Sequence, residues 1–189
     1  MYSARLSTSV RSHLRAATAS AHERLDAMVN GLPLEEPATY GRFLAAQGSA
    51  LFPLEKALTE EGIAALLPDW PNRMRTKALD SDLMYLGIGC EQLPKPQFRH
   101  PALMMGAAYV LEGSRLGARV ILSRIGRHHN HHATNFLYHG EGQRLWPTFE
   151  AALEATPSVR ADLEGAVTGA LRTFAMFEQA FAPITESAH

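Results

Sequence analysis

The sequence predicts an all-α fold, a single-domain bundle of six or more helices. Apolar residues recur every three or four positions along most of the chain, which is the period of an amphipathic helix. Runs of alternating β-branched residues between hairpin turns, which would indicate strands, are absent from the sequence. The length of 189 residues suits one domain. We therefore expect one domain over 1–189, with flexible termini of about 1–8 and 183–189.

The first two helices are predicted from their apolar stripes and their end signals. A helix over about 7–29 is ended by Asn30 and Gly31. A second helix opens at Pro37, and its apolar stripe continues to Leu58. Pro53 lies inside this stripe, and a proline in a helix interior costs about 3 kcal/mol. We therefore expect a kink or an early break near 49–53.

The rest of the chain shows the same period, interrupted by glycine and proline. Helices are expected at about 72–87, 101–126, 143–155 and 158–182. Residues 62–72 are typical of turns, and two glycines and two prolines predict a loop over 87–100. Residues 127–142 are polar and rich in histidine, and they are expected to form a loop.

Composition excludes several classes of function. Eighteen basic and 19 acidic residues give a net charge of −1, so the whole chain has no electrostatic attraction to nucleic acid or membranes. Cys90 is the only cysteine, which excludes an internal disulfide and multi-cysteine zinc or iron–sulfur sites. No apolar stretch approaches 18 residues, and no secretory leader is evident, so a cytoplasmic location is expected. Residues 1–22 contain arginines and no acid, which is also typical of a transit peptide.

The predicted helix over 101–126 contains three glycines, Gly106, Gly113 and Gly117. Each interior glycine costs about 1 kcal/mol relative to alanine, so three of them need an explanation. Gly113 and Gly117 share one helix face, with Ala118 beside them. A face without side chains allows close approach, either of another helix or of a flat ligand. Spacing alone does not distinguish these two interpretations.

His22 lies on the apolar stripe of the first helix, between Thr18 and Leu25. One interpretation is a hydrogen-bonded histidine in the core, and the other is an axial ligand to a metal or heme iron. Asp26 follows on the same face and could fix the ring tautomer. Arg15 precedes on that face, either as a solvated charge or as a partner for a ligand carboxylate.

Two further patterns have more than one interpretation. The run from His128 to His132 could chelate divalent metals or form an exposed loop. Phe174, Phe177 and Phe181 have the spacing of a helix face that belongs to the core or contacts a cofactor. No phosphate-binding loop, dinucleotide-binding glycine motif, nucleophile elbow or di-iron Glu-x-x-His pair is present.

Taken together, these residues resemble a heme oxygenase of the bacterial, biliverdin-forming type. Residues 14–26, LRAATASAHERLD, resemble the proximal helix of that family. Residues 109–118, YVLEGSRLGA, resemble its distal helix, which carries glycines. Residues 136–142, with Trp146 and Phe149 after them, form a weaker third match. The resemblance runs in order over about 10–182.

The resemblance implies an all-α fold with heme between the proximal and distal helices. It assigns His22 as the iron ligand, and Gly113 and Gly117 as the glycines that let the distal backbone lie over the heme. The remaining implied contacts with heme or its ligand are Arg15, Asp26, Ala118, Phe174 and Phe177. Ser114 stands where animal members carry an aspartate that organises water, and Ala118 replaces a glycine found in many members.

The implied activity is oxidative opening of heme to biliverdin, with release of CO and ferrous iron. It requires O2 and electrons from a ferredoxin, a flavodoxin-like protein or a reductase, because the chain shows no flavin or nicotinamide motif. No partnership with nucleic acid or membrane is expected. Two alternatives remain, a heme carrier or sensor on the same fold, and a helical protein with another ligand or only a protein partner.

Overall fold

The computed structural model describes residues 9–125 and 133–186, and within these ranges it contains helices and no strand. This confirms the predicted all-α class. The longer helices are α1 (Val10–Asn30), α2 (Pro37–Glu60), α4 (Thr76–Leu86), α5 (Pro101–Ile125), α7 (Leu145–Ala155) and α9 (Leu163–Glu186). The shorter ones are η1 (Ile63–Ala65), α3 (Trp70–Arg73), α6 (Asn135–Tyr138) and α8 (Pro157–Ala161). No described helix is long and apolar enough to cross a membrane.

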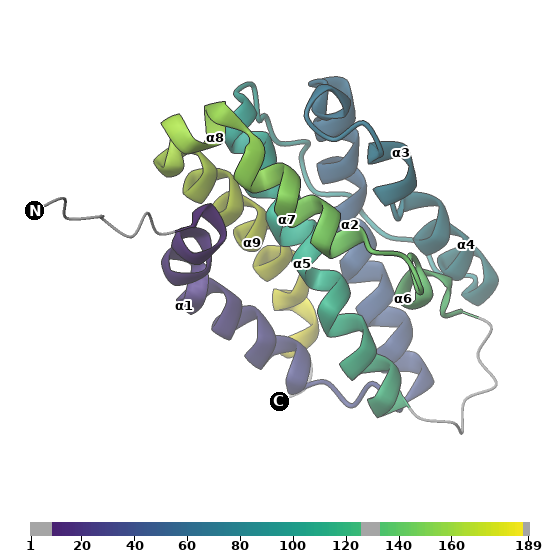
Figure 1. Cartoon of the computed structure of the whole chain (residues 1–189). Coiled ribbons are helices and arrows are strands. Elements are labelled where there is room, and N and C mark those ends of the chain that lie inside the picture. Colours follow the sequence, from purple (N-terminus) through teal and green to yellow (C-terminus); the bar gives the residue numbers. More distant parts are fainter. Residues whose placement is uncertain (1–8, 126–132, 187–189) are drawn as a thin grey trace, which may run out of the picture.

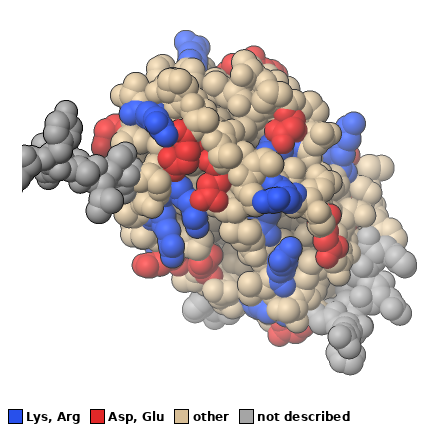
Figure 2. Space-filling model, viewed as in Figure 1, with Lys and Arg blue, Asp and Glu red and all other residues tan. Residues whose placement is uncertain are grey.

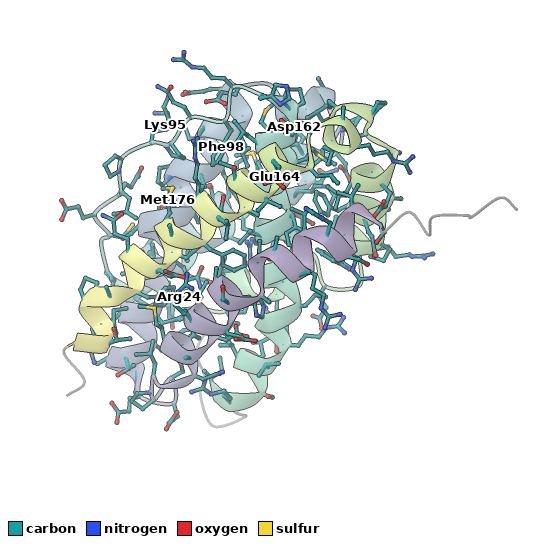
Figure 3. All side chains as sticks on the ribbon, turned by 90° about the vertical axis from the view of Figure 1, so that its left-hand side faces the viewer. Arg24, Lys95, Phe98, Asp162, Glu164 and Met176 are labelled. Carbon is teal, nitrogen blue, oxygen red and sulfur yellow. The ribbon has the colours of Figure 1, made fainter. Side chains whose placement is uncertain are left out.

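Helix α9 is the central support of the bundle and packs against α5, α1 and α2 (Figure 1). Its contact with α5 is close because each helix presents a glycine to the backbone of the other. A Cβ on Gly106 would lie 1.9 Å from the carbonyl oxygen of Ala166, and a Cβ on Gly169 would lie 2.1 Å from that of Leu103. On the other side, Arg24 of α1 pairs with Glu178 of α9 at 2.9 Å (Figure 3).

The expected break near Pro53 does not occur, because α2 continues through the buried proline to Glu60. A proline at position 53 leaves the carbonyl of Ser49 without its helical donor. The backbone N–H of Leu93 donates to that carbonyl at 2.9 Å. The linker before α5 thus replaces the lost hydrogen bond, and Glu61 holds it further along by accepting from the N–H of Phe98 at 2.6 Å (Figure 3).

Two predicted helices are divided, and carboxylates explain both divisions. The predicted helix over 72–87 is split into α3 and α4, because Glu55 accepts from the backbone N–H groups of Arg75 and Thr76 at 2.8 and 2.9 Å. The predicted helix over 158–182 is split into α8 and α9, where Asp162 accepts from the N–H of Gly165 at 2.8 Å. Unpaired N–H groups at a helix start favour an acceptor at these places.

The expected loop over 127–142 contains α6, which sequence reasoning missed. Asp82 of α4 accepts from the backbone N–H groups of Asn135 and Phe136 at 3.1 and 2.8 Å. The Tyr40 hydroxyl donates to the carbonyl of Ala133 at 2.7 Å. Burial raises the pKa of both Asp82 and Tyr40. The run His128–His132 lies outside the described residues, so the choice between a metal-chelating segment and an exposed loop is not tested.

Candidate functional site

His22 is exposed on the flank of α1, so the interpretation as a core histidine is wrong. Its side chain is 62% exposed, and its Nδ1 lies 3.1 Å from the carboxylate of Asp26. A proton on Nδ1 held by that carboxylate leaves Nε2 with the lone pair for an external ligand. The ring of Phe174 meets the imidazole edge-on at 6.0 Å between centroids. Phe177 is buried in the core one turn further along α9.

The glycines of α5 divide into two kinds. Gly106 serves helix packing, since a side chain there would strike the backbone of α9. Gly113 is different, because its Cβ would make only an ordinary contact, 3.7 Å from the ring of Trp146. A Cβ on Gly117 would have no atom within 4 Å. Helix packing therefore does not explain Gly117, and open space beside its backbone fits a ligand that lies flat.

Two large apolar side chains are exposed beside these glycines. Leu116 and Val120 are each 57% exposed and lie four residues apart, one above the other on α5. Helical spacing places them next to the face that carries Gly113 and Gly117. Exposed apolar side chains grouped at an open backbone indicate a surface for an apolar ligand.

The Ser114 hydroxyl is held by two hydrogen bonds within the protein. It donates to the carbonyl of Leu111 at 2.8 Å and accepts from the guanidinium of Arg75 at 2.9 Å. The same guanidinium nitrogen donates to the Leu111 carbonyl at 3.0 Å. Arg75 is buried, and burial, with the nearby charge of Arg115, lowers its pKa to about 10. Ala118 is also buried, and its heme contact stays a prediction.

Arg75 belongs to a cluster with the buried Arg73 and the partly buried Arg115, and sequence reasoning missed this cluster. Arg73 and Arg115 both pair with the buried carboxylate of Glu112, at 2.7 and 3.0 Å. Arg115 also donates to the backbone carbonyl of Arg73 and lies 3.0 Å from Nδ1 of His139. A buried ion pair is stabilised only when its remaining groups are also hydrogen-bonded, as those of Arg73, Glu112 and Arg115 are here. Among the described residues, the buried Nε of Arg75 has no such partner. The sequence carried no signal for this cluster, because its members come from α3, α5 and the turns beside them.

Basic and aromatic side chains meet between the first half of α1 and α5. The guanidinium of Arg11 lies 5.9 Å from the ring centroid of Trp146, and the rings of Trp146 and Tyr109 are also 5.9 Å apart. Burial raises the pKa of Tyr109, while Arg11, Arg15 and Thr18 of α1 oppose that rise. Arg15, although exposed, is therefore close to the α5 side of α1. Figure 2 shows basic side chains on either side of an uncharged stretch of this surface.

The residues fit a heme better than a bare metal ion. Among the described residues, no group of three or more histidine, cysteine, aspartate or glutamate side chains could hold a metal. A heme iron already has four nitrogen ligands from its ring and needs one or two more, which a single histidine can begin to supply. A cavity of about 870 Å³ lined by parts of α3, α4 and α6 contains none of the predicted site residues.

Comparison with known proteins decides the family. The family model described as heme oxygenase matches residues 8–183. The chain belongs to the heme oxygenase family. A heme oxygenase of Xanthomonas campestris is 30% identical over 147 residues, which cover 76% of this chain and 89% of that protein. Heme oxygenase PigA of Pseudomonas aeruginosa is 28% identical over 172 residues, with 87% of each chain covered.

Solved heme oxygenases also share the fold. The enzyme from Neisseria meningitidis, studied with NO and CO bound, superposes with a TM-score of 0.78 at 21% identity, and 92% of each chain is covered. The heme oxygenase from Leptospira interrogans gives a TM-score of 0.69 at 18% identity, over 93% of this chain and 99% of that one. The all-helical heme oxygenase fold and the enzyme class expected from the sequence are thereby confirmed.

Proposed function

We propose that this heme oxygenase holds heme between α1 and α5 and opens it to biliverdin, with release of CO and ferrous iron. The observation that carries this proposal is the pairing of an exposed, carboxylate-held imidazole, His22, with an open backbone at Gly117. When bound, the heme supplies the iron at which O2 is activated. Membership of the heme oxygenase family supports the reaction.

His22 is the proposed iron ligand, through Nε2. Asp26 holds Nδ1 at 3.1 Å and so orients the ring, as acceptors behind metal-bound histidines generally do. Phe174 limits rotation of the imidazole from the α9 side. The flat face of the heme would then meet the backbone at Gly117, where a Cβ would have no neighbour within 4 Å, while the ring of Trp146 lies beside Gly113.

Ser114 and Arg75 are the proposed groups for ordering water on the distal side. The Ser114 hydroxyl donates a hydrogen bond to the Leu111 carbonyl and accepts one from Arg75. One lone pair of its oxygen is left, so toward a water molecule it can act only as an acceptor. In this arrangement a water would donate one proton to the Ser114 oxygen, and its second proton would point away from the serine and be available for transfer.

Arg15 is the proposed anchor for a heme carboxylate, because it is exposed and lies on the same side of α1 as His22. The electrons come from a separate protein, and a ferredoxin, a flavodoxin-like protein and a reductase are equally compatible with the chain. Action in the cytoplasm stays a prediction, which cell fractionation would test.

The experiment is a hemin titration followed by reduction in air, with His22→Ala compared against His13→Ala on the same helix. Wild type and His13→Ala are expected to give a shifted Soret band that decays to a bilin spectrum. His22→Ala is expected to lose turnover and to recover part of it with added imidazole. Unchanged turnover in His22→Ala would refute the ligand assignment. A stable Soret band in the wild type would favour a heme carrier or sensor.

A further inference from the structure

The end of α1 is held by an arginine that belongs to α5. Arg124 donates to the backbone carbonyl of Leu32 at 2.6 Å. It also lies 3.4 Å from the carbonyl oxygens of Val29 and Asn30 and from the side-chain oxygen of Asn30. One guanidinium therefore spans the last turn of α1 and the segment that follows it, where the chain passes the end of α5 (Figure 1).

Physical chemistry favours a cation at this place. The last carbonyl groups of a helix have no donor within the helix, and they carry partial negative charge. Helix α1 has no basic residue in its own last turn, and the N–H of Gly31 is directed to Ala27. A planar guanidinium with several N–H groups can serve more than one carbonyl at once. The N–H of Leu32 donates to the Val29 carbonyl at 3.2 Å, and Arg124 adds from α5 the cation that the last turn of α1 lacks.

The Arg124 contact lies at one end of the proposed heme site. Toward the other end, Thr18 of α1 meets Tyr109 of α5. Between these two places, α1 rises about 16 Å and α5 about 22 Å, at 1.5 Å for each residue. His22 and Gly117 both fall within this interval. The beginning of α1 is held by α7 instead, where Glu154 accepts from the N–H of Arg11 at 2.9 Å.

We propose that Arg124 is a positioning residue that fixes the spacing between the helix that carries His22 and the helix that carries Gly117. By joining the end of α1 to the end of α5, it holds the two walls of the heme site at the separation that binding requires. This inference rests on the proposed heme site between α1 and α5. Arg124 acts through the backbone of α1.

The test compares Arg124→Gln and Arg124→Lys with Arg119→Gln, a change of an exposed arginine on the same helix. Amide hydrogen exchange of the heme-free protein reports on residues 27–34. Release of hemin to an excess of apomyoglobin reports on the site. The iron–histidine stretching band of the ferrous complex reports on how His22 is held. The first measurement needs no heme, so it remains informative if the proposed function fails.

Arg124→Gln is expected to speed amide exchange at the end of α1 and hemin release, each by about tenfold, and to shift the iron–histidine band. Arg124→Lys keeps the positive charge but loses the planar guanidinium, so it is expected to show each effect only in part. Arg119→Gln is expected to leave all three measurements unchanged. Unchanged exchange over 27–34 in Arg124→Gln would overturn the proposal. Faster hemin release with unchanged exchange would overturn it too, because Arg124 would then act on heme directly.

Discussion

Alanine substitutions at Gly106 and Gly117 should have opposite effects on the stability of the heme-free protein, although both residues lie in α5. At Gly117, a Cβ would have no neighbour within 4 Å, so the change only improves helix propensity. The gain is about 1 kcal/mol, which raises the Tm of a protein of this size by about 2–4 °C. At Gly106, the Cβ would lie 1.9 Å from a backbone oxygen and 2.7 Å from its carbon.

Backbone atoms of α9 cannot move aside as a flexible side chain can. Overpacking of this kind costs up to about 3 kcal/mol, of which helix propensity returns about 1 kcal/mol. Gly106→Ala should therefore lose about 2 kcal/mol and lower the Tm by about 4–8 °C. Thermal unfolding of the two heme-free variants beside wild type measures both shifts. A rise in Tm for Gly106→Ala equal to that for Gly117→Ala would refute the assignment of Gly106 to helix packing.

Hemin affinity gives a second test of the open space beside Gly117. Gly117→Leu should keep the helix stable while its side chain fills the space that heme needs. An overpacking cost of about 1–3 kcal/mol corresponds to a roughly 5- to 150-fold weaker affinity. Hemin titration by Soret absorbance gives the Kd of each variant. Wild-type affinity in Gly117→Leu would contradict a close approach of heme to this backbone.

Three further substitutions have defined outcomes. Arg75→Met should slow bilin formation about tenfold and change hemin affinity less, because Arg75 contacts Ser114 on the distal side. Stopped-flow absorbance measures the rate of bilin formation, and hemin titration measures the affinity. Burial and the nearby charge of Arg115 lower the pKa of His139 from 6.5. The unfolded chain therefore binds this proton at a higher pH than the folded chain, so the free energy of unfolding falls as the pH drops through the folded-state pKa. His139→Gln should flatten this decline when urea unfolding is measured on either side of pH 6.5. Tyr40→Phe should lower the free energy of unfolding by about 1–3 kcal/mol, because a buried carbonyl loses its donor, and unchanged urea midpoints would contradict that.

Much of the fold could be predicted from hydrophobic period, and the errors lie where distant residues determine the backbone. The extents of α1, α5 and α7 agree with the predicted ranges to within a few residues. The break expected at Pro53 is absent because the N–H of Leu93, from a different segment, replaces the missing donor. The division between α3 and α4 depends on Glu55, some twenty residues earlier. Such long-range hydrogen bonds leave no trace in local propensity.

The candidate site was predictable only in part. The spacing of His22 and Asp26 on one face and the two α5 glycines could be recognised, because each pattern lies within one helix. Spacing alone left open whether the face of Gly113 and Gly117 meets another helix or a flat ligand, and the neighbouring atoms show that Gly106 is the glycine that packs against α9. The buried partner of Ser114 and the arginine that holds the end of α1 join different elements, so they required the folded structure.

The central claim, that this chain opens heme in the space beside His22 and Gly117, is tested most directly by the product of a single turnover. The purified protein is loaded with one equivalent of hemin and given a reductant in air, with catalase present to remove free peroxide. The account predicts decay of the Soret band, biliverdin in the extracted pigment, and CO and ferrous iron in equal amounts to it. Recovery of intact heme after reduction in air, with neither biliverdin nor CO, would contradict it.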